Sequence, residues 1–514
     1  MKSLIIHGHF YQPPRENPWT FAIDGEPSAA PFHDWNQRVT AECYKPNSQV
    51  RITQEDGVEK LVNNYAIINF DFGPTLLSWL EHADPETYAR IIAADVESAR
   101  RNSGHGNAIA QAYSHAILPL CNERDLRTQV RWGLADFRHR FKRDAEALWL
   151  PETACNDEVM GVLIDEGLRF AILAPRQARR SRTDIHVFGK SPGEWRNADD
   201  RNIDTSIAYR YLHRDGSNRS IAVFFYDQEL AGAIAFERAL TSSELLVERI
   251  TRVPEGAGPL VNVATDGESY GHHHKFGDLC LAYALEVEAP RRGFSVTNYG
   301  EYLDEYPPSA EVEIGHGSRG QGTSWSCIHG VNRWDEDCGC RTGGEAHWNQ
   351  TWRRPLRAAL DYLRDEVALH FEATRGDLFV DPWAARDDSI ELILDPLRSR
   401  EAFLSQRVSR ALSRADEIRA LLFLEMQRHT LLVYASCGWF FNDISGIESV
   451  LVLRYAGRVI DLMDQLGLPS PRERFLEILG EAKSNRPEMG NGADIFIQMV
   501  DSARTDSNSD LIFY

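Results

Sequence analysis

The sequence predicts an α/β protein in which an incomplete seven-stranded (β/α) barrel is followed by an α-helical domain. Short apolar runs bounded by turn residues are typical of buried strands, and several are separated by helical patterns at 85–101, 123–141 and 157–166. Strands that alternate with helices pair in parallel through right-handed crossovers. About seven runs indicate a barrel related to the eight-stranded one but incomplete. The runs cover 3–6, 66–70, 108–112, 146–150, 170–173, 221–225 and 260–264.

The C-terminal part has a different pattern. From 353 onward, apolar residues recur at helical spacing with charges between them, and residues such as Gly446 and Pro469 mark the breaks. An aromatic loop at 436–443 interrupts this pattern, either to dock the helices or to reach the ligand. We therefore expect a barrel at 1–310 with a polar insertion near 177–219, a Trp- and Cys-containing active-site loop at 311–352, and a helical domain at 353–514.

Composition excludes several classes of partner. The 514-residue chain carries a net charge of -20 and has a pI near 5.3, which argues against nucleic acid and anionic membranes. No apolar run approaches the length of a membrane span, and the first residues do not resemble a signal peptide. The eight cysteines, several in apolar segments, favour free thiols in a reducing compartment. We expect a cytoplasmic protein without a cofactor; its oligomeric state is not predicted.

Two carboxylates follow strand-like runs. Glu152 comes directly after 145–150, and Asp266 comes after 260–264. Chemistry in such barrels lies at the carboxyl ends of the strands. Glycosidic bond cleavage needs two carboxyl groups, one that attacks or stabilises the anomeric carbon and one that protonates the leaving oxygen. In the simpler interpretation, Glu152 caps the helix that starts near 156, and Asp266 begins a polar turn.

Imidazoles and aromatic rings accompany these carboxylates. His7 and His9 are two positions apart on an extended chain and point the same way, so they can bind a metal or a polyhydroxylated ligand. Gln12 follows them, before a double proline. Tyr226 and Asp227 end another strand and are second-rank candidates, with a solvated turn as the alternative.

Five motifs occur in order along the chain. They are His7-Gly8-His9-Phe10-Tyr11-Gln12-Pro13, the stretch 104–119, Trp149-Leu150-Pro151-Glu152, the stretch 264–272 of the form Asp-x-Glu-x-x-Gly-His, and Thr323-Ser324-Trp325-Ser326-Cys327 with Trp334 behind it. Together they resemble glycoside hydrolase family 57, in its branch with a long helical C-terminal region of unassigned role. The candidate substrate-binding residues are His7, His9, Gln12, His115, Trp149, Glu268, Tyr270, His272, Trp325 and Trp334.

The resemblance implies an enzyme. Glu152 would be the nucleophile and Asp266 the general acid/base of a retaining glycoside hydrolase or transglycosylase acting on α-glucan-type oligosaccharides or polysaccharides. Two departures leave the substrate open: the second motif has Asn107 or Ala108 where many members carry Glu, and the fifth is embellished by cysteines. The sequence does not separate hydrolysis from glycosyl transfer.

Two other functional classes are compatible with parts of the sequence. His7, His9, Asp266 and the run 272–274 would suit a metal-dependent carbohydrate deacetylase or a mannosidase-like hydrolase on a related barrel, although three consecutive histidines cannot all face one ion. A catalytically silent carbohydrate-binding protein is disfavoured because both carboxylates are present. Four cysteine and histidine residues in and after the fifth motif could bind a structural zinc ion or could simply pack in the loop, and their spacing slightly favours packing. They are Cys327, His329, Cys338 and Cys340.

Overall fold

The chain forms two compact units. The computed structural model describes residues 2–504 apart from 54–56, 184–192, 201 and 253–257. The first unit comprises Met1–Gln12, Gly25–Ala112 and Phe137–Ser326, and the second comprises Pro13–Asp24, Tyr113–Asp136 and Cys327–Tyr514.

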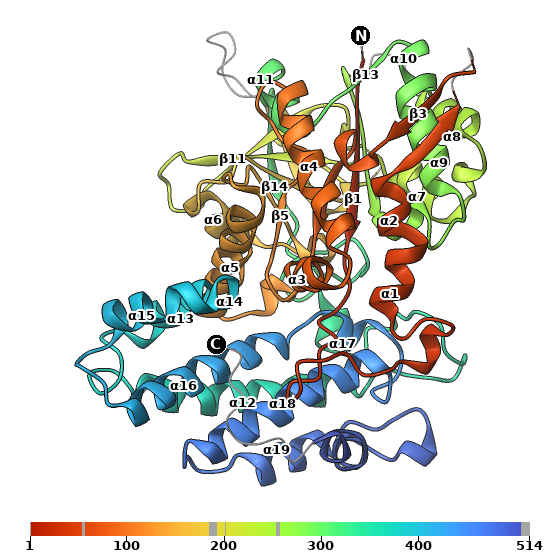
Figure 1. Cartoon of the computed structure of the whole chain (residues 1–514). Coiled ribbons are helices and arrows are strands. Elements are labelled where there is room, and N and C mark those ends of the chain that lie inside the picture. Colours follow the sequence, from red (N-terminus) through yellow and green to blue (C-terminus); the bar gives the residue numbers. More distant parts are fainter. Residues whose placement is uncertain (1, 54–56, 184–192, 201, 253–257, 505–514) are drawn as a thin grey trace. The chain divides into compact units, whose positions relative to one another are not determined.

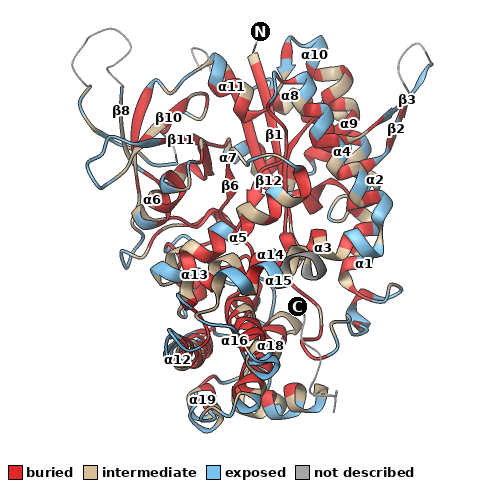
Figure 2. Ribbon diagram, turned by 60° about the vertical axis from the view of Figure 1, so that its left-hand side comes forward, coloured by how far each residue is buried: buried red, intermediate tan, exposed pale blue. Residues whose placement is uncertain are grey.

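Strand β1 (Lys2–Phe10) is central in the first unit (Figures 1 and 2). It is buried along nearly its whole length, as expected for a continuous apolar strand of a parallel sheet. Its three neighbours all run parallel to it: β12 (Leu260–Asp266), β4 (Asn69–Phe72) and β13 (Phe294–Val296).

All seven expected strands occur, but their pairing is discontinuous. β5 (Ala110–Gln111) pairs only with β6 (Leu148–Trp149), and β7 (Phe170–Leu173) pairs in parallel with β11 (Ser220–Phe225). Single parallel bridges, Phe70 to Ala108 and Ala147 to Phe170, join these pieces. The described strands thus divide into separate sheets of four, six, two and two strands rather than one seven-stranded sheet, because β5 and β6 are too short for extended ladders.

The polar insertion widens one of these sheets. β10 (Ala208–Leu212) pairs antiparallel with β11, and beyond it lie β14 (Ala310–Ile314), β8 (Ala178–Thr183) and β9 (Arg196–Asn197). The polar insertion expected near 177–219 therefore extends the sheet that contains β7, while 184–192 lies outside the described residues. β2 (Val50–Thr53) and β3 (Glu59–Val62) form a separate hairpin.

Helices pack around the strands of the first unit. The side chain of Asp84 caps α4 by accepting from the Thr87 N–H, and Asn156 caps α6 through the Val159 N–H. These helices are α1 (Trp35–Val39), α2 (Lys45–Ser48), α3 (Pro74–Ala83), α4 (Pro85–Arg101), α6 (Asp157–Asp165), α7 (Gln228–Phe236), α8 (Ser243–Ile250), α9 (Gly277–Tyr283), α10 (Ala289–Arg291) and α11 (Tyr299–Glu305); α5 (Glu123–Phe141) runs across the division.

The second unit is helical, as expected. α16 is buried on all sides over its second half (Figure 2), the pattern of a helix at the centre of a bundle. Among the described residues, no helix is both long and apolar enough to span a membrane. The helices are α12 (Arg353–Glu372), α13 (Pro382–Asp388), α14 (Ile390–Leu394), α15 (Pro396–Arg407), α16 (Arg414–Leu432), α17 (Cys437–Phe440), α18 (Ile447–Gln465), α19 (Arg472–Leu479) and α20 (Gly492–Ile495).

The second unit also differs from the contiguous 353–514 domain expected from the sequence. Two segments from the N-terminal half belong to it, and polar contacts explain why. The Trp19 indole donates to Asp461 at 2.8 Å, and the buried Arg386 guanidinium donates to Asp125 at 2.6 Å. Distant parts of the sequence thus complete one helical core.

Candidate functional site

Glu152 lies in a strained backbone turn. It belongs to a short 3-10 segment, Pro151–Thr153, with φ 59° and ψ 21°, and Thr153 follows at φ 50°. Residues with side chains adopt this left-handed region at a cost, and they cluster at functional sites. Because Asn156 caps α6, the interpretation of Glu152 as a helix cap is wrong.

Two donors hold the Glu152 carboxylate. The Trp325 indole Nε1 donates to Oε2 at 2.9 Å, and the Ser326 hydroxyl donates to the same oxygen at 2.5 Å. The Trp325 N–H also donates to the Glu152 carbonyl at 3.0 Å, which fixes the two segments against each other. Hydrogen bonds to a carboxylate favour its ionised form. Two donors thus orient the half-buried Glu152 carboxyl group.

Asp266 ends β12 beside β1. The parallel register pairs His7 with Ala264 and His9 with Asp266, so the imidazole of His9 and this carboxylate come from adjacent strand positions. The Asp266 side chain retains access to solvent although protein surrounds it. Desolvation raises the pKa of Asp266; the charge of His9 opposes this effect and Asp71 adds to it. These surroundings favour the protonated form of Asp266 more than bulk water does.

Asp71 on β4 joins the two histidines. His7 Nε2 donates to Oδ1 at 2.9 Å, and His9 Nδ1 donates to Oδ2 at 2.8 Å, with all three side chains buried. Burial lowers the pKa of His7 and dominates there. Burial also lowers the pKa of His9, but the charges of Asp71, Asp266 and Glu268 outweigh it and raise this pKa to about 9. His9 is thus an imidazolium at neutral pH.

Trp149 supports both imidazoles. Its ring stacks on His7 at 4.7 Å and on His9 at 5.0 Å between centroids, and it meets Trp325 edge-on at 5.3 Å. Trp149 is 1% exposed and belongs to the core cluster against which Trp325 packs. The Trp149 ring therefore positions its neighbours and has no free face for a sugar.

Shared neighbours connect the two carboxylates. Trp325, which holds Glu152, has its ring centroid 6.4 Å from that of His9 and 6.2 Å from that of Tyr226. Both His9 and Tyr226 interact electrostatically with Asp266. Glu152 and Asp266 thus share one small group of neighbouring side chains. A separation of roughly 5–7 Å between their carboxyl groups, as expected for a retaining pair, remains a prediction.

Glu268 is a third carboxyl group in this region. It is buried and accepts from the Tyr44 hydroxyl at 2.6 Å and from the Tyr11 N–H at 3.2 Å. Desolvation and the charge of Asp266 raise its pKa to about 7, although the hydrogen bond from Tyr44 opposes the shift. Gln12 hydrogen-bonds to Tyr44 in turn. Glu268 is therefore partly protonated at neutral pH.

Tyr270 and His272 lie at the end of the same motif. The Thr265 hydroxyl donates to the fully buried Tyr270 hydroxyl at 3.0 Å, which identifies Tyr270 as a packing residue in this structure. His272 Nδ1 donates to Glu42 at 2.5 Å and remains partly exposed. The second-rank candidate Asp227 caps α7 through the Leu230 N–H. Of these three, Tyr270 is fully buried, whereas His272 and Asp227 both remain partly exposed.

His115 and Trp334 belong to the second unit, where both meet Ser436. The His115 imidazole hydrogen-bonds to the Ser436 hydroxyl at 2.6 Å, and the Trp334 indole donates to its carbonyl at 3.1 Å. Trp334 has no accessible surface, so the prediction of an exposed sugar-binding ring in the loop is wrong for this residue. The indole N–H is satisfied inside the unit, and burial of the ring stabilises the aromatic loop.

Three contributors were not identified from the sequence: Asp71, Tyr44 and Ser326. Asp71 directly follows the apolar run 66–70, as Glu152 follows 145–150, so the same sequence signal indicates it. Tyr44 lies in an irregular helical segment with no motif of its own. Ser326 stands inside the fifth motif beside Trp325, but nothing in the sequence indicates that its hydroxyl reaches Glu152.

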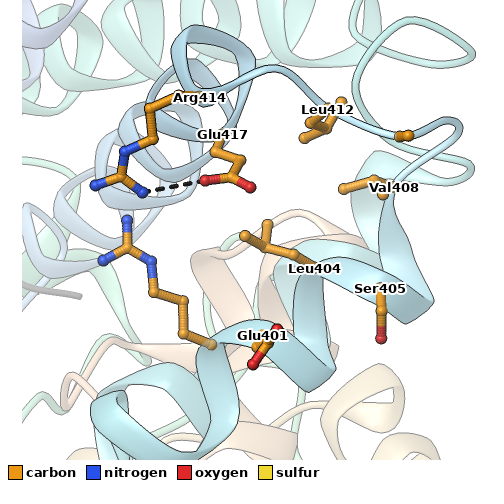
Figure 3. A pocket seen from close by; sticks show the side chains of 9 residues that line it. Glu401, Leu404, Ser405, Val408, Leu412, Arg414 and Glu417 are labelled. Carbon is orange, nitrogen blue, oxygen red and sulfur yellow. Dashed lines mark hydrogen bonds and ion pairs between the residues drawn. The ribbon is translucent and has the colours of Figure 1, made fainter.

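A separate pocket lies in the second unit between α15 and α16 (Figure 3). Leu404, Val408 and Leu412 line its apolar part, and the ion pair of exposed Arg414 with half-buried Glu417, 3.1 Å apart, lies at its edge. None of the candidate site residues lines this pocket. A surface ion pair beside three aliphatic side chains offers no reactive group.

Comparison with known proteins identifies the chain. Residues 7–315 match the family model of glycosyl hydrolase family 57, and residues 348–510 match a domain of unknown function. Because the first match covers more than half of the chain, this protein is a glycosyl hydrolase by family. It belongs to glycosyl hydrolase family 57, as its motifs predict. None of the curated proteins matches the chain.

Solved structures show the same fold. An exo-type maltose-forming amylase from Pyrococcus sp. ST04 has a TM-score of 0.65 at 15% identity, covering 93% of this chain and 82% of that one. A branching enzyme of the same family from Thermococcus kodakaraensis has a TM-score of 0.54 at 15% identity, covering 100% and 98%. A 4-alpha-glucanotransferase from Thermococcus litoralis has a TM-score of 0.52 at 14% identity, covering 90% and 60%.

Proposed function

We propose that this protein is a retaining glycoside hydrolase or transglycosylase that acts on α-glucan-type oligosaccharides or polysaccharides. The observation that carries the proposal is the contrast between Glu152, whose carboxylate oxygen accepts two hydrogen bonds, and Asp266, whose surroundings raise its pKa. A pair of carboxyl groups with opposed protonation is what double displacement requires. The named activities of its structural neighbours favour α-glucan as the substrate.

In the first step, a Glu152 carboxylate oxygen attacks the anomeric carbon while Asp266 donates a proton to the departing oxygen. The glycosidic bond breaks and an ester to Glu152 forms. In the second step, the Asp266 carboxylate removes a proton from water or from an acceptor sugar hydroxyl. That oxygen attacks the anomeric carbon, Glu152 departs as the carboxylate, and Asp266 is protonated again.

His9 and Asp71 support this cycle. The His9 imidazolium lies beside Asp266 and limits the rise of that pKa, so the group can give up its proton and still retrieve it. Asp71 holds His9 in its charged form and in one orientation. We assign Trp325 and His272 to contact with sugar, since both side chains remain partly exposed.

We also infer that the strands of the first unit amount to an incomplete barrel. Beyond the ladders, the Asp227 N–H donates to the Asn262 carbonyl at 2.8 Å, and the Asn262 side chain donates to the Phe225 carbonyl at 3.1 Å. These contacts link the end of β11 to β12. Together with the bridges at Phe70 and Ala147, these contacts support an arrangement of seven strands around a common core.

The metal-dependent alternative receives no support from the contacts of its candidate ligands. His7 and His9 each direct a nitrogen to a separate oxygen of Asp71 rather than toward a common point. Within the described residues, groups with ligand atoms close enough to hold one ion occur only in the cysteine-containing loop.

Product analysis tests the function. Incubation with maltooligosaccharides and with glycogen should release or rearrange α-glucan chains, and NMR of the first product should show retained α configuration. Protein with Glu152→Gln serves as the inactive blank, and Glu158→Gln, an exposed residue on α6, serves as the active control. Initial release of the β anomer, or no reaction on any α-glucan, would overturn the proposal.

A further inference from the structure

Four side chains of types that can bind metals converge in the loop that begins the third segment of the second unit. Cys327, His329, Cys338 and Cys340 each offer one ligand atom, and these atoms all lie within 4.8 Å of one another. The Cys327 sulfur is 3.8 Å from each of the other two sulfurs, and the Cys340 sulfur is 3.6 Å from His329 Nδ1. The four side chains thus surround one point.

These separations match the edges of a zinc tetrahedron. Bonds of about 2.3 Å from zinc to sulfur and about 2.0 Å from zinc to nitrogen give edges of about 3.8 Å between sulfurs and about 3.5 Å between sulfur and nitrogen. A disulfide, in contrast, would place two sulfurs about 2.05 Å apart. All of these cysteines are free thiols. The observed spacing fits metal coordination and is too long for a covalent bridge.

Two glycines with positive φ shape the backbone turns that carry the four candidate ligands. Gly330 has φ 111° and its N–H donates to the Cys327 carbonyl at 3.1 Å, which closes the turn around His329. Gly339, with φ 82°, separates Cys338 from Cys340. Positive φ is readily accessible to glycine, and it turns the chain so that residues on either side can face one centre.

A buried cation lies beside the cluster. The Arg353 guanidinium has no accessible surface, and its Nη1 donates to the Cys340 carbonyl at 3.0 Å. Zinc with three thiolates and a neutral imidazole carries a net charge of -1. Arg353 offsets that charge, whereas neutral thiols would leave this buried cation without a nearby anionic counterpart from the cluster.

The loop itself needs a cross-link. Between Cys327 and the start of α12 at Arg353, the 3-10 turn Asn332–Trp334 is the single regular helix or strand among the described residues. Loops of this length without secondary structure are uncommon in compact domains, and metal ligation is one way to order them.

We propose that Cys327, His329, Cys338 and Cys340 bind one structural zinc ion. Three cysteines and one histidine are a known structural ligand set, and four protein ligands leave no open position for substrate. The geometry thus reverses the slight preference for simple packing that the spacing alone gives. The ion would order the loop independently of whether Glu152 and Asp266 act as proposed.

Metal analysis of protein purified without a histidine tag tests this inference. Wild-type protein should contain about one zinc per chain, and Cys338→Ser should lose most of it. Cys121→Ser, a half-buried thiol of the second unit outside the cluster, should keep it. Refolding with cobalt should give thiolate-to-metal charge transfer and the intense d–d bands of tetrahedral coordination, absent from Cys338→Ser.

Wild-type protein alone suffices if Cys338→Ser does not fold. An organomercurial titrated onto the thiols should release one zinc, detected with a colorimetric chelator, and lower the melting temperature. Three results would each overturn the assignment. Wild-type protein could contain no zinc even when it is expressed in medium supplemented with zinc, or it could contain a disulfide among Cys327, Cys338 and Cys340. Cys121→Ser could also lose as much metal as Cys338→Ser. Because none of these readouts uses activity, failure here is distinguishable from failure of the catalytic proposal.

Discussion

The surroundings of the carboxyl groups differ between the two sides of the candidate site. Around Glu152, the Trp325 and Ser326 donors converge on one oxygen and stabilise the anion. Around Asp266 and Glu268, desolvation raises the pKa of each group, and the two carboxyl groups lie near enough to interact. Opposed surroundings of this kind are those expected of a nucleophile and an acid, and they support the proposed roles independently of any motif.

The largest expected effect comes from removing the anion. Glu152→Gln should lower kcat by about 10⁴-fold or more, because the amide cannot form the glycosyl ester, while oligosaccharide binding persists. Calorimetry should then show binding without turnover. Glu158→Gln is the matched control with unchanged kcat. If Glu152→Gln kept more than about a tenth of the activity, the nucleophile would be another residue.

Removal of the acid should be severe but dependent on the substrate. Asp266→Asn should lower kcat on natural glucans by about 10²–10⁴-fold, the range for loss of a general acid/base. An activated α-glucoside should still load onto Glu152, since a good leaving group departs without a proton. Mass spectrometry should detect this adduct, and azide should release it as the α-glycosyl azide. An inverted azide, or an adduct on another residue, would contradict the assigned roles.

The residues around the two carboxylates differ in how far the sequence predicts them. Glu152, Asp266 and their strands were predictable because each carboxylate breaks an apolar run at a strand end. Asp71 gives the same signal after the run 66–70, although it belongs to none of the five motifs. Ser326 was not predictable, since its contact with Glu152 depends on how a loop from beyond β14 folds back.

The helical region shows the same limit. The periodicity predicted helices at 396–419 and 420–435, but Ser413 caps a helix that starts at Arg414, and α15 ends at Arg407. Apolar spacing continues across this break, so periodicity alone could not place it. The grouping of 13–24 and 113–136 with the C-terminal helices was equally hidden, because it rests on single long-range contacts such as Trp19 to Asp461.

Glu268 allows a test through stability. Its pKa is about 7 when folded and about 4.5 otherwise, so the folded state retains the proton as the pH rises through this window. Its stabilising contribution is full below pH 4.5 and is lost as pH rises through 7. The stability of wild type relative to Glu268→Gln should therefore fall by about 3 kcal/mol between pH 4.5 and 8. Urea unfolding of both proteins measures this difference. Parallel curves would show that Glu268 titrates normally.

The smallest effect should come from the donors to Glu152. Trp325→Phe keeps a ring against His9 and Trp149 but removes the N–H bonded to the carboxylate, and a hydrogen bond to a charged group contributes about 1.5–3 kcal/mol. Because the carboxylate retains the Ser326 hydroxyl, kcat should fall only about tenfold. Ser326→Ala should lower kcat by a similar factor. The double variant should lower kcat by more than the product of the two factors, since both donors share one oxygen.

Steady-state kinetics of the wild type, the two single variants and the double variant, with melting temperatures to confirm folding, complete the cycle. Strictly multiplicative losses would mean that the two donors act independently, and unchanged kcat in the double variant would mean that Glu152 needs no such support.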